Sequence, residues 1–164
     1  MHTHSARRTF VRTLIAAIAS GVPASFGAQA LAQATGSVRG FDHVALPMQD
    51  TDAMLAFYRR LGFDVRETTS VVSVYVGEQM INFHRPSLWQ NGAFTLKAPG
   101  AKPPCGDLCF VWDGSPTALR TLLDSAGGPL VEGPVARQGG RKKPGSSVYT
   151  RDPDGNLLEF IIYA

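Results

Sequence analysis

Residues 150–164 read TRDPDGNLLEFIIYA and combine a turn signal with a nearly apolar strand. The run Asp-Pro-Asp-Gly-Asn at 152–156 is typical of a tight turn, and residues 157–163 predict a buried β-strand. Glu159 lies within that strand, and Leu157 and Ile161 share its face if side chains alternate. Burying an unpaired carboxylate is costly, so we expect Glu159 to be paired or to bind a metal. A solvent-facing strand is the alternative.

The residues before this strand predict the same series of elements twice. The first half predicts a strand over 40–48, a helix over 50–62 and three short strands, over 63–69, 72–77 and 79–85. A loop over 86–104 follows. The second half predicts a strand over 107–113, a helix over 115–128 and three strands, over 129–138, 146–152 and 157–163. Asp50 and Ser115 are the expected N-caps, and Gly62 and Gly127 the expected helix stops. Each half therefore reads β-α-β-β-β.

Aligning the two halves pairs the polar residues of their first and last strands. His43 falls at Asp107, and Asn82 falls at Glu159. We expect an α+β fold in which two βαβββ modules form an incomplete mixed β-barrel around a cleft, with these four side chains converging there. His84 lies two residues past Asn82, on the same face of the same strand.

Residues 1–34 predict a cleaved export signal. Arg7, Arg8 and Arg12 precede a short apolar run and several Ala-x-Ala sites, and the paired arginines are typical of a twin-arginine signal. An ordinary secretory signal or an uncleaved anchor is the alternative. We expect a periplasmic protein without a membrane span in its mature form.

Removing that segment also removes three basic residues and no acid, which leaves the remaining chain formally neutral. A nucleic-acid partner is not expected, because such proteins need a basic patch. The cluster Arg141–Lys143 is a short charged run in a predicted turn, more typical of a solvated loop than of a ligand clamp. Cys105 and Cys109 are expected to be free thiols, with Cys109 buried.

The motifs FDHVALPMQDTDAMLAFYRRLGFDV (41–65) and YTRDPDGNLLEFIIY (149–163) together resemble the vicinal oxygen chelate superfamily, which includes glyoxalase I, bleomycin-resistance proteins and extradiol dioxygenases. Small glyoxalase-domain proteins are the nearest resemblance, and it covers about residues 38–163. It implies one domain over 35–164, with modules at about 38–86 and 104–164. It also implies a divalent metal in the cleft.

The resemblance places His43 and Glu159 at ligand positions of the family. Asp107 stands where metal-binding members usually have histidine, and Asn82 where they often have glutamate or glutamine. His43, Glu159, His84 and Asp107 are thus the candidate ligands, for Mn, Ni, Fe or Zn. Glu159, with Asp107 second, is the candidate catalytic base. The candidate substrate contacts are Asn82, Ser147, Tyr149 and Arg141.

Three functions remain open from the sequence. The first is a metal-dependent lyase or isomerase acting on a small oxygen-chelating substrate. The second is a non-catalytic small-molecule binding protein of the bleomycin-resistance type. The third is a dioxygenase, which would need His43, His84 and Glu159 together. A homodimer is also possible, since an incomplete barrel leaves strand edges that a partner could cover.

Overall fold

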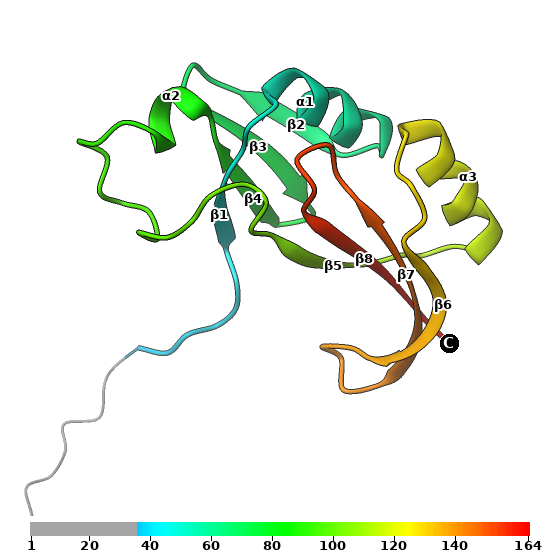
Figure 1. Cartoon of the computed structure of the whole chain (residues 1–164). Helices are drawn as coiled ribbons and strands as arrows, with labels where there is room; N and C mark the ends of the chain where they lie inside the picture. The colour runs from blue at the N-terminus through cyan, green and yellow to red at the C-terminus, as the bar shows by residue number, and fades with distance from the viewer. Residues whose placement is uncertain (1–35) are drawn as a thin grey trace, which may run out of the picture. The chain divides into compact units, whose positions relative to one another are not determined.

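Two four-stranded mixed sheets make up the fold in the computed structural model, which describes residues 36–164. The first sheet has the strand order β1-β4-β3-β2, and helix α1 follows β1 (Figure 1). Only β1 and β4 are parallel. The elements are β1 (His43–Pro47), α1 (Thr51–Arg60), β2 (Asp64–Glu67), β3 (Val71–Val76) and β4 (Gln79–His84).

The second sheet repeats this plan with the order β5-β8-β7-β6, and α3 follows β5. Its parallel pair is β5 with β8. The elements are β5 (Asp107–Val111), α3 (Pro116–Ala126), β6 (Glu132–Gln138), β7 (Pro144–Arg151) and β8 (Leu157–Tyr163). Two βαβββ modules with unclosed mixed sheets confirm the predicted α+β fold.

The strand register confirms the alignment of the two halves. Ala45 of β1 lies opposite Asn82 of β4, and Cys109 of β5 lies opposite Glu159 of β8. Because Ala45 and Cys109 are both the third residues of their strands, Asn82 and Glu159 occupy equivalent places in the two sheets.

The helix boundaries follow the predicted caps. The Asp50 carboxylate accepts a hydrogen bond from the amide of Ala53 at 3.1 Å, and Ser115 caps α3 in the same way. Gly127 ends α3 with a φ of 82°, in the left-handed region that glycine adopts without strain.

The prediction of a loop over 86–104 was wrong at its start, because residues Pro86–Trp89 form the short helix α2. Pro86 occupies the first turn, where its missing N–H is tolerated and its fixed φ suits the helix. After α2 the chain loops outward before it returns to the start of β5 (Figure 1).

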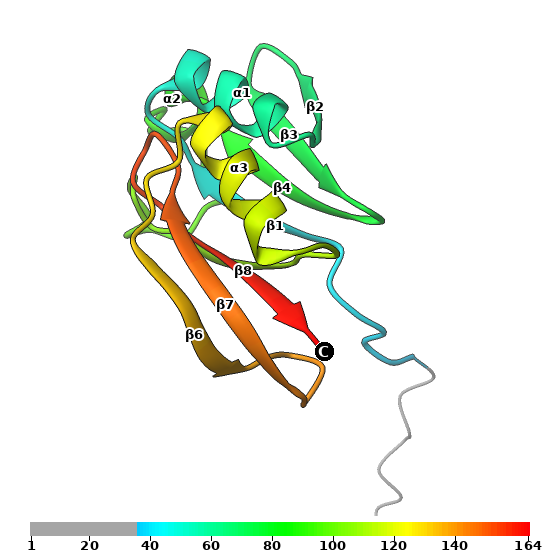
Figure 2. The same cartoon turned by 90° about the vertical axis from the view of Figure 1, so that its right-hand side faces the viewer.

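A shared core joins the two modules, and residues 39–164 form one compact unit. One face of each sheet is apolar and packs against α1 and α3, which contact each other (Figure 2). Tyr58 of α1 packs against Phe83 of β4, with ring centroids 5.4 Å apart. Phe63 of the first module contacts Phe110 of the second at 5.3 Å, so neither module buries its apolar face alone.

The turn over 152–156 links the modules through hydrogen bonds. The Asp154 carboxylate accepts from the backbone amides of Gln49 and Asp50, at 2.6 and 2.8 Å. These amides lie directly before α1, so Asp154 attaches the second module to the start of the first module's helix.

Asp152 and Asn156 extend this link inside the protein. Asp152 is buried and accepts from the Tyr58 hydroxyl at 3.1 Å and from the side-chain amide of Asn156 at 2.8 Å. Burial raises the pKa of the Tyr58 hydroxyl and, despite these hydrogen bonds, that of the Asp152 carboxyl. The side-chain carbonyl of Asn156 accepts from the amides of Cys105 and Gly106, just before β5.

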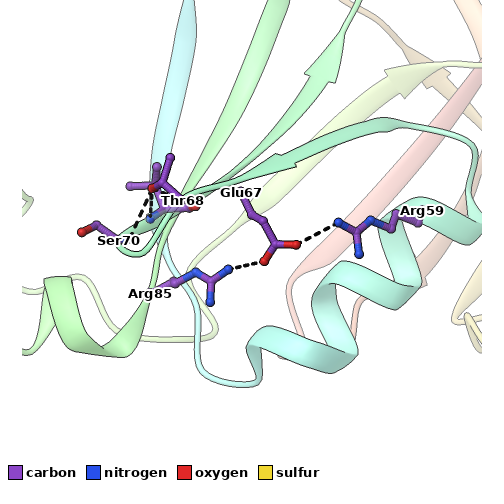
Figure 3. A network of polar contacts seen from close by, with 6 residues as sticks. Arg59, Glu67, Thr68, Ser70 and Arg85 are labelled. Atoms are coloured by element: carbon purple, nitrogen blue, oxygen red, sulfur yellow. Dashed lines mark hydrogen bonds and ion pairs between the residues drawn. The ribbon is translucent and has the colours of Figure 1, made fainter.

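A second set of polar contacts holds the end of β4 against α1. Glu67 accepts hydrogen bonds from Arg59 at 3.0 Å and from Arg85 at 2.5 Å (Figure 3). These hydrogen bonds lower the pKa of the Glu67 carboxyl. Arg85 connects His84 to α2, so the ion pair between Arg85 and Glu67 fixes the position of His84 and of the start of α2.

The predicted signal at 1–34 lies outside the described residues. Within residues 36–164, no helix has the length and apolar character needed to cross a membrane.

Replacing Asp154 with alanine should destabilise the protein by about 1–3 kcal/mol, because two backbone amides lose a charged acceptor. The free energy of unfolding from urea titration measures this loss. Asp113→Ala, at an exposed aspartate after β5, is the matched control and should change it by less than about 0.5 kcal/mol. Equal stability of the two variants would contradict the linking role of the turn.

Candidate functional site

The sequence-predicted site residues lie on the faces of the two sheets opposite the core, except Arg141, which lies in the turn between β6 and β7. Strand alternation sends one set of side chains into the core, such as Phe83 and Leu158, and the other set outward. On the first sheet the outward set includes His43, Ala45, Asn82 and His84. On the second sheet it includes Asp107, Cys109, Ser147, Tyr149 and Glu159.

Glu159 is half-buried and held by a neighbouring strand. The Ser147 hydroxyl, which is fully buried, donates to its carboxylate at 2.5 Å. Leu157 is half-buried and Ile161 is buried on the same face, as the alternation predicts. The Ser147 hydroxyl is thus a hydrogen-bond partner of the Glu159 carboxylate. This short hydrogen bond fixes the orientation of the carboxylate.

Cys109 lies opposite Glu159 and is also affected by it. Both cysteines are free thiols, as predicted, but Cys109 is exposed and not buried. It is exposed because it lies on the outward face of edge strand β5. Partial desolvation, followed by the charge and hydrogen bonding of Glu159, raises the pKa of the Cys109 thiol to about 11.

Tyr149 is the second register partner of Glu159, and it is bound by an arginine that the sequence did not single out. Arg137 of β6 donates to the Tyr149 hydroxyl at 2.9 Å, and its guanidinium lies 5.4 Å from the ring centroid. Arg141 instead stacks on Tyr163, at 5.1 Å. Of the two arginines, only Arg137 contacts a partner of Glu159.

The other candidate positions have separate local partners. His43 is exposed, and its Nδ1 lies 2.6 Å from the Asp42 carboxylate. Asp107 is exposed at the start of β5. Asn82 accepts a hydrogen bond from Ser73 at 3.2 Å, so both equivalent positions, Asn82 and Glu159, receive a serine hydroxyl.

His84 lines a pocket of about 390 Å³ on the outward face of the first sheet. The residue is 8% exposed, and Phe94 meets its ring edge-on, with centroids 5.2 Å apart. Burial lowers the pKa of the imidazole, so it is neutral at neutral pH. The pocket is lined by Ala45, Pro47, His84, Trp89, Leu96, Lys97, Ala98 and Ala101.

Trp89 and Lys97 were missed because they lie in the segment that the sequence predicted as a plain loop. The Trp89 indole donates to the Met48 carbonyl at 2.8 Å, and Lys97 donates to the Trp89 carbonyl. These bonds fold the segment back over the sheet. The aromatic residues Trp89 and Phe94, within a stretch rich in Gly and Pro, were the available signal.

The candidate metal ligands of one chain do not form a complete set. Across residues 36–164, no group of three or more His, Cys, Asp or Glu side chains is arranged to hold a metal ion. Catalytic zinc sites, for comparison, use three protein ligands. The donors of a single chain therefore do not fit a resident metal by themselves, and the ligand roles of His43, Glu159, His84 and Asp107 stay predictions.

The family model and the related proteins point to the same family and say little about a specific function. The model of the Glyoxalase/Bleomycin resistance protein/Dioxygenase superfamily matches residues 40–160. The glyoxalase domain-containing protein RDO1 of Mycosarcoma maydis is 38% identical over 128 residues, which are 77% of this chain and 70% of that protein. The virulence protein STM3117 of Salmonella typhimurium is 36% identical over 124 residues, 74% and 83% of the two chains.

The crystal structure of that virulence protein superposes with a TM-score of 0.69 at 32% identity, over 79% of this chain and all of the other. A lactoylglutathione lyase from Agrobacterium tumefaciens superposes with a TM-score of 0.58 at 22% identity, over 77% of this chain and 96% of the other. That second likeness shows a common fold alone.

Replacing Glu159 with glutamine should lower the pKa of the Cys109 thiol from about 11 towards 9, because a negative charge beside the thiol is removed. In a Cys105→Ser background, the rate of iodoacetamide alkylation near pH 9 should then rise several-fold. Asp113→Asn serves as the control and should leave the rate unchanged. Equal rates in both variants would show that Glu159 does not act on this thiol.

Proposed function

The chain belongs to the Glyoxalase/Bleomycin resistance protein/Dioxygenase superfamily, and we propose that it binds a small organic molecule in the pocket on the first sheet. The observation that carries the proposal is a pocket of about 390 Å³ with His84 in its wall. This volume is in the range of small-molecule sites, which are mostly apolar and have a few polar groups that orient the ligand.

His84 supports this function because its ring has no protein partner in the described part of the chain. Residues 36–164 provide no hydrogen bond to the imidazole, and burial alone shifts its pKa. The imidazole nitrogens are not among the fully buried, unpaired side-chain atoms of residues 36–164, so they are accessible from the pocket and can form a hydrogen bond with a ligand there. The next residue, Arg85, pairs with Glu67 at 2.5 Å and so fixes the chain directly after His84.

Filling the pocket should abolish binding. The fluorescent probe 1-anilinonaphthalene-8-sulfonate should bind the unmodified protein, since its rings suit an apolar site next to Trp89. Ala45→Phe places a large side chain in the pocket and should reduce the affinity at least tenfold. Ala136→Phe, on the exposed edge strand β6, is the matched control. The same affinity in both variants would contradict a ligand site on the first sheet.

A second candidate is the metal-dependent lyase or isomerase, with Mn, Ni, Fe or Zn as the cofactor. The half-buried Glu159, oriented by Ser147 on the outward face, favours it. The missing donors would then come from a second copy of the chain, whose His43 is exposed and accessible to a partner. This candidate thus includes the homodimer.

Metal content and oligomeric state test this candidate together. After anaerobic purification from the source organism, the protein should hold about one metal per chain and run as a dimer. Glu159→Ala should remove the metal, and Ser147→Ala should lower the metal affinity about 10- to 100-fold, because Ser147 orients the carboxylate. Glu78→Ala, at an exposed glutamate before β4, is the control. A folded, metal-free protein that still binds a ligand would contradict the metal-dependent lyase or isomerase and would support the binding function.

Export is also part of this proposal. It depends on the paired arginines Arg7 and Arg8 in the predicted signal, and it would place the binding function in the periplasm.

A further inference from the structure

The wall of the pocket is mostly apolar but contains one positively charged side chain. Lys97 is the single cation among the eight lining residues of the pocket, and none of the eight carries a carboxylate. One N–H of the Lys97 ammonium is bound to the Trp89 carbonyl. An ammonium has three donors, so two remain for a ligand.

Neighbouring groups do not neutralise or add to this charge. His84 lines the pocket and offers an imidazole for hydrogen bonding. Arg85 follows His84 in sequence, but its guanidinium is paired with Glu67 at 2.5 Å (Figure 3). The pocket thus presents about one positive charge.

The remaining wall suits an apolar body. Pro47, Trp89 and three alanines line it, and Leu96 also reaches it although 83% of that residue is exposed. A large exposed apolar side chain at the rim of a pocket gains burial when a ligand enters.

We propose that the pocket takes a small organic monocarboxylate, with the carboxylate at Lys97, an apolar or aromatic body against Trp89 and Pro47, and a hydrogen bond to His84. This inference rests on the proposed binding function and adds the class of ligand. A cationic ligand would find no carboxylate in the lining. A phosphate ester carries about two negative charges and is normally bound by several cations or by a guanidinium fork, neither of which the lining provides.

The emission of Trp89 gives a direct readout. The chain has two tryptophans, so Trp112→Phe leaves Trp89 as the only fluorescent indole. In that background, benzoate, benzyl alcohol and benzylamine can be titrated as probes of equal ring size and different charge. Benzoate should bind at least tenfold more tightly than either of the others, and its affinity should fall as salt rises.

Variants at Lys97 test whether its positive charge binds the carboxylate of the ligand. Lys97→Met should weaken benzoate binding at least tenfold, while Lys97→Arg should retain most of it. Lys102→Met, at an exposed lysine outside the pocket, should stay within twofold of the parent. Circular dichroism spectra of the variants check that the fold is kept.

The outcomes separate this inference from the function on which it rests. Equal binding of benzoate and benzyl alcohol, unaffected by Lys97→Met, would overturn the monocarboxylate and leave small-molecule binding intact. If none of the probes changes the Trp89 emission, and Ala45→Phe does not affect binding of the naphthalene sulfonate, both proposals are overturned. Selective binding of benzoate that Lys97→Met abolishes and Lys102→Met preserves supports the inference.

Discussion

The turn over 152–156 is the constraint on which the rest of the structure depends. Its carboxylates and amide bind backbone groups ahead of α1 and ahead of β5, and Asp152 also receives the Tyr58 hydroxyl. Asp152 and Asn156 are buried, so breaking one of their bonds would leave a buried polar group unsatisfied, which costs more than the bond itself contributes. The two modules are therefore held in one arrangement, and their apolar faces can form a single core.

This constraint explains why the most recognisable motif of the chain says little about its chemistry. Asp152, Asp154 and Asn156 are all used in holding the modules together. Glu159, three residues beyond the turn, lies on the outward face of the second sheet. Family membership thus follows from residues that determine the fold. The residues predicted for the site face outward instead, and at Asn82 and Asp107 they differ from the pattern that the resemblance implies.

Duplication of the module gives two outward faces that have taken different forms. At equivalent places, Asn82 receives Ser73 in the first sheet and Glu159 receives Ser147 in the second. The first sheet is covered in part by the segment after β4, which creates the pocket around His84. The second sheet instead presents a carboxylate beside a free thiol. One chain thus has a pocket on its first sheet and a half-buried carboxylate beside a thiol on its second.

The sequence alone determined the repeated β-α-β-β-β order, the caps at Asp50 and Ser115, and the equivalence of Asn82 with Glu159. These features depend on local backbone preferences and on the two-residue period of strands, which act over short distances. Only the tertiary structure decided that Ser147 meets Glu159, that Cys109 is exposed, and that Trp89 and Lys97 close a pocket over His84. These features depend on how distant segments of the chain fold back on the sheets. The separation of two residues in the sequence does not determine their distance in space.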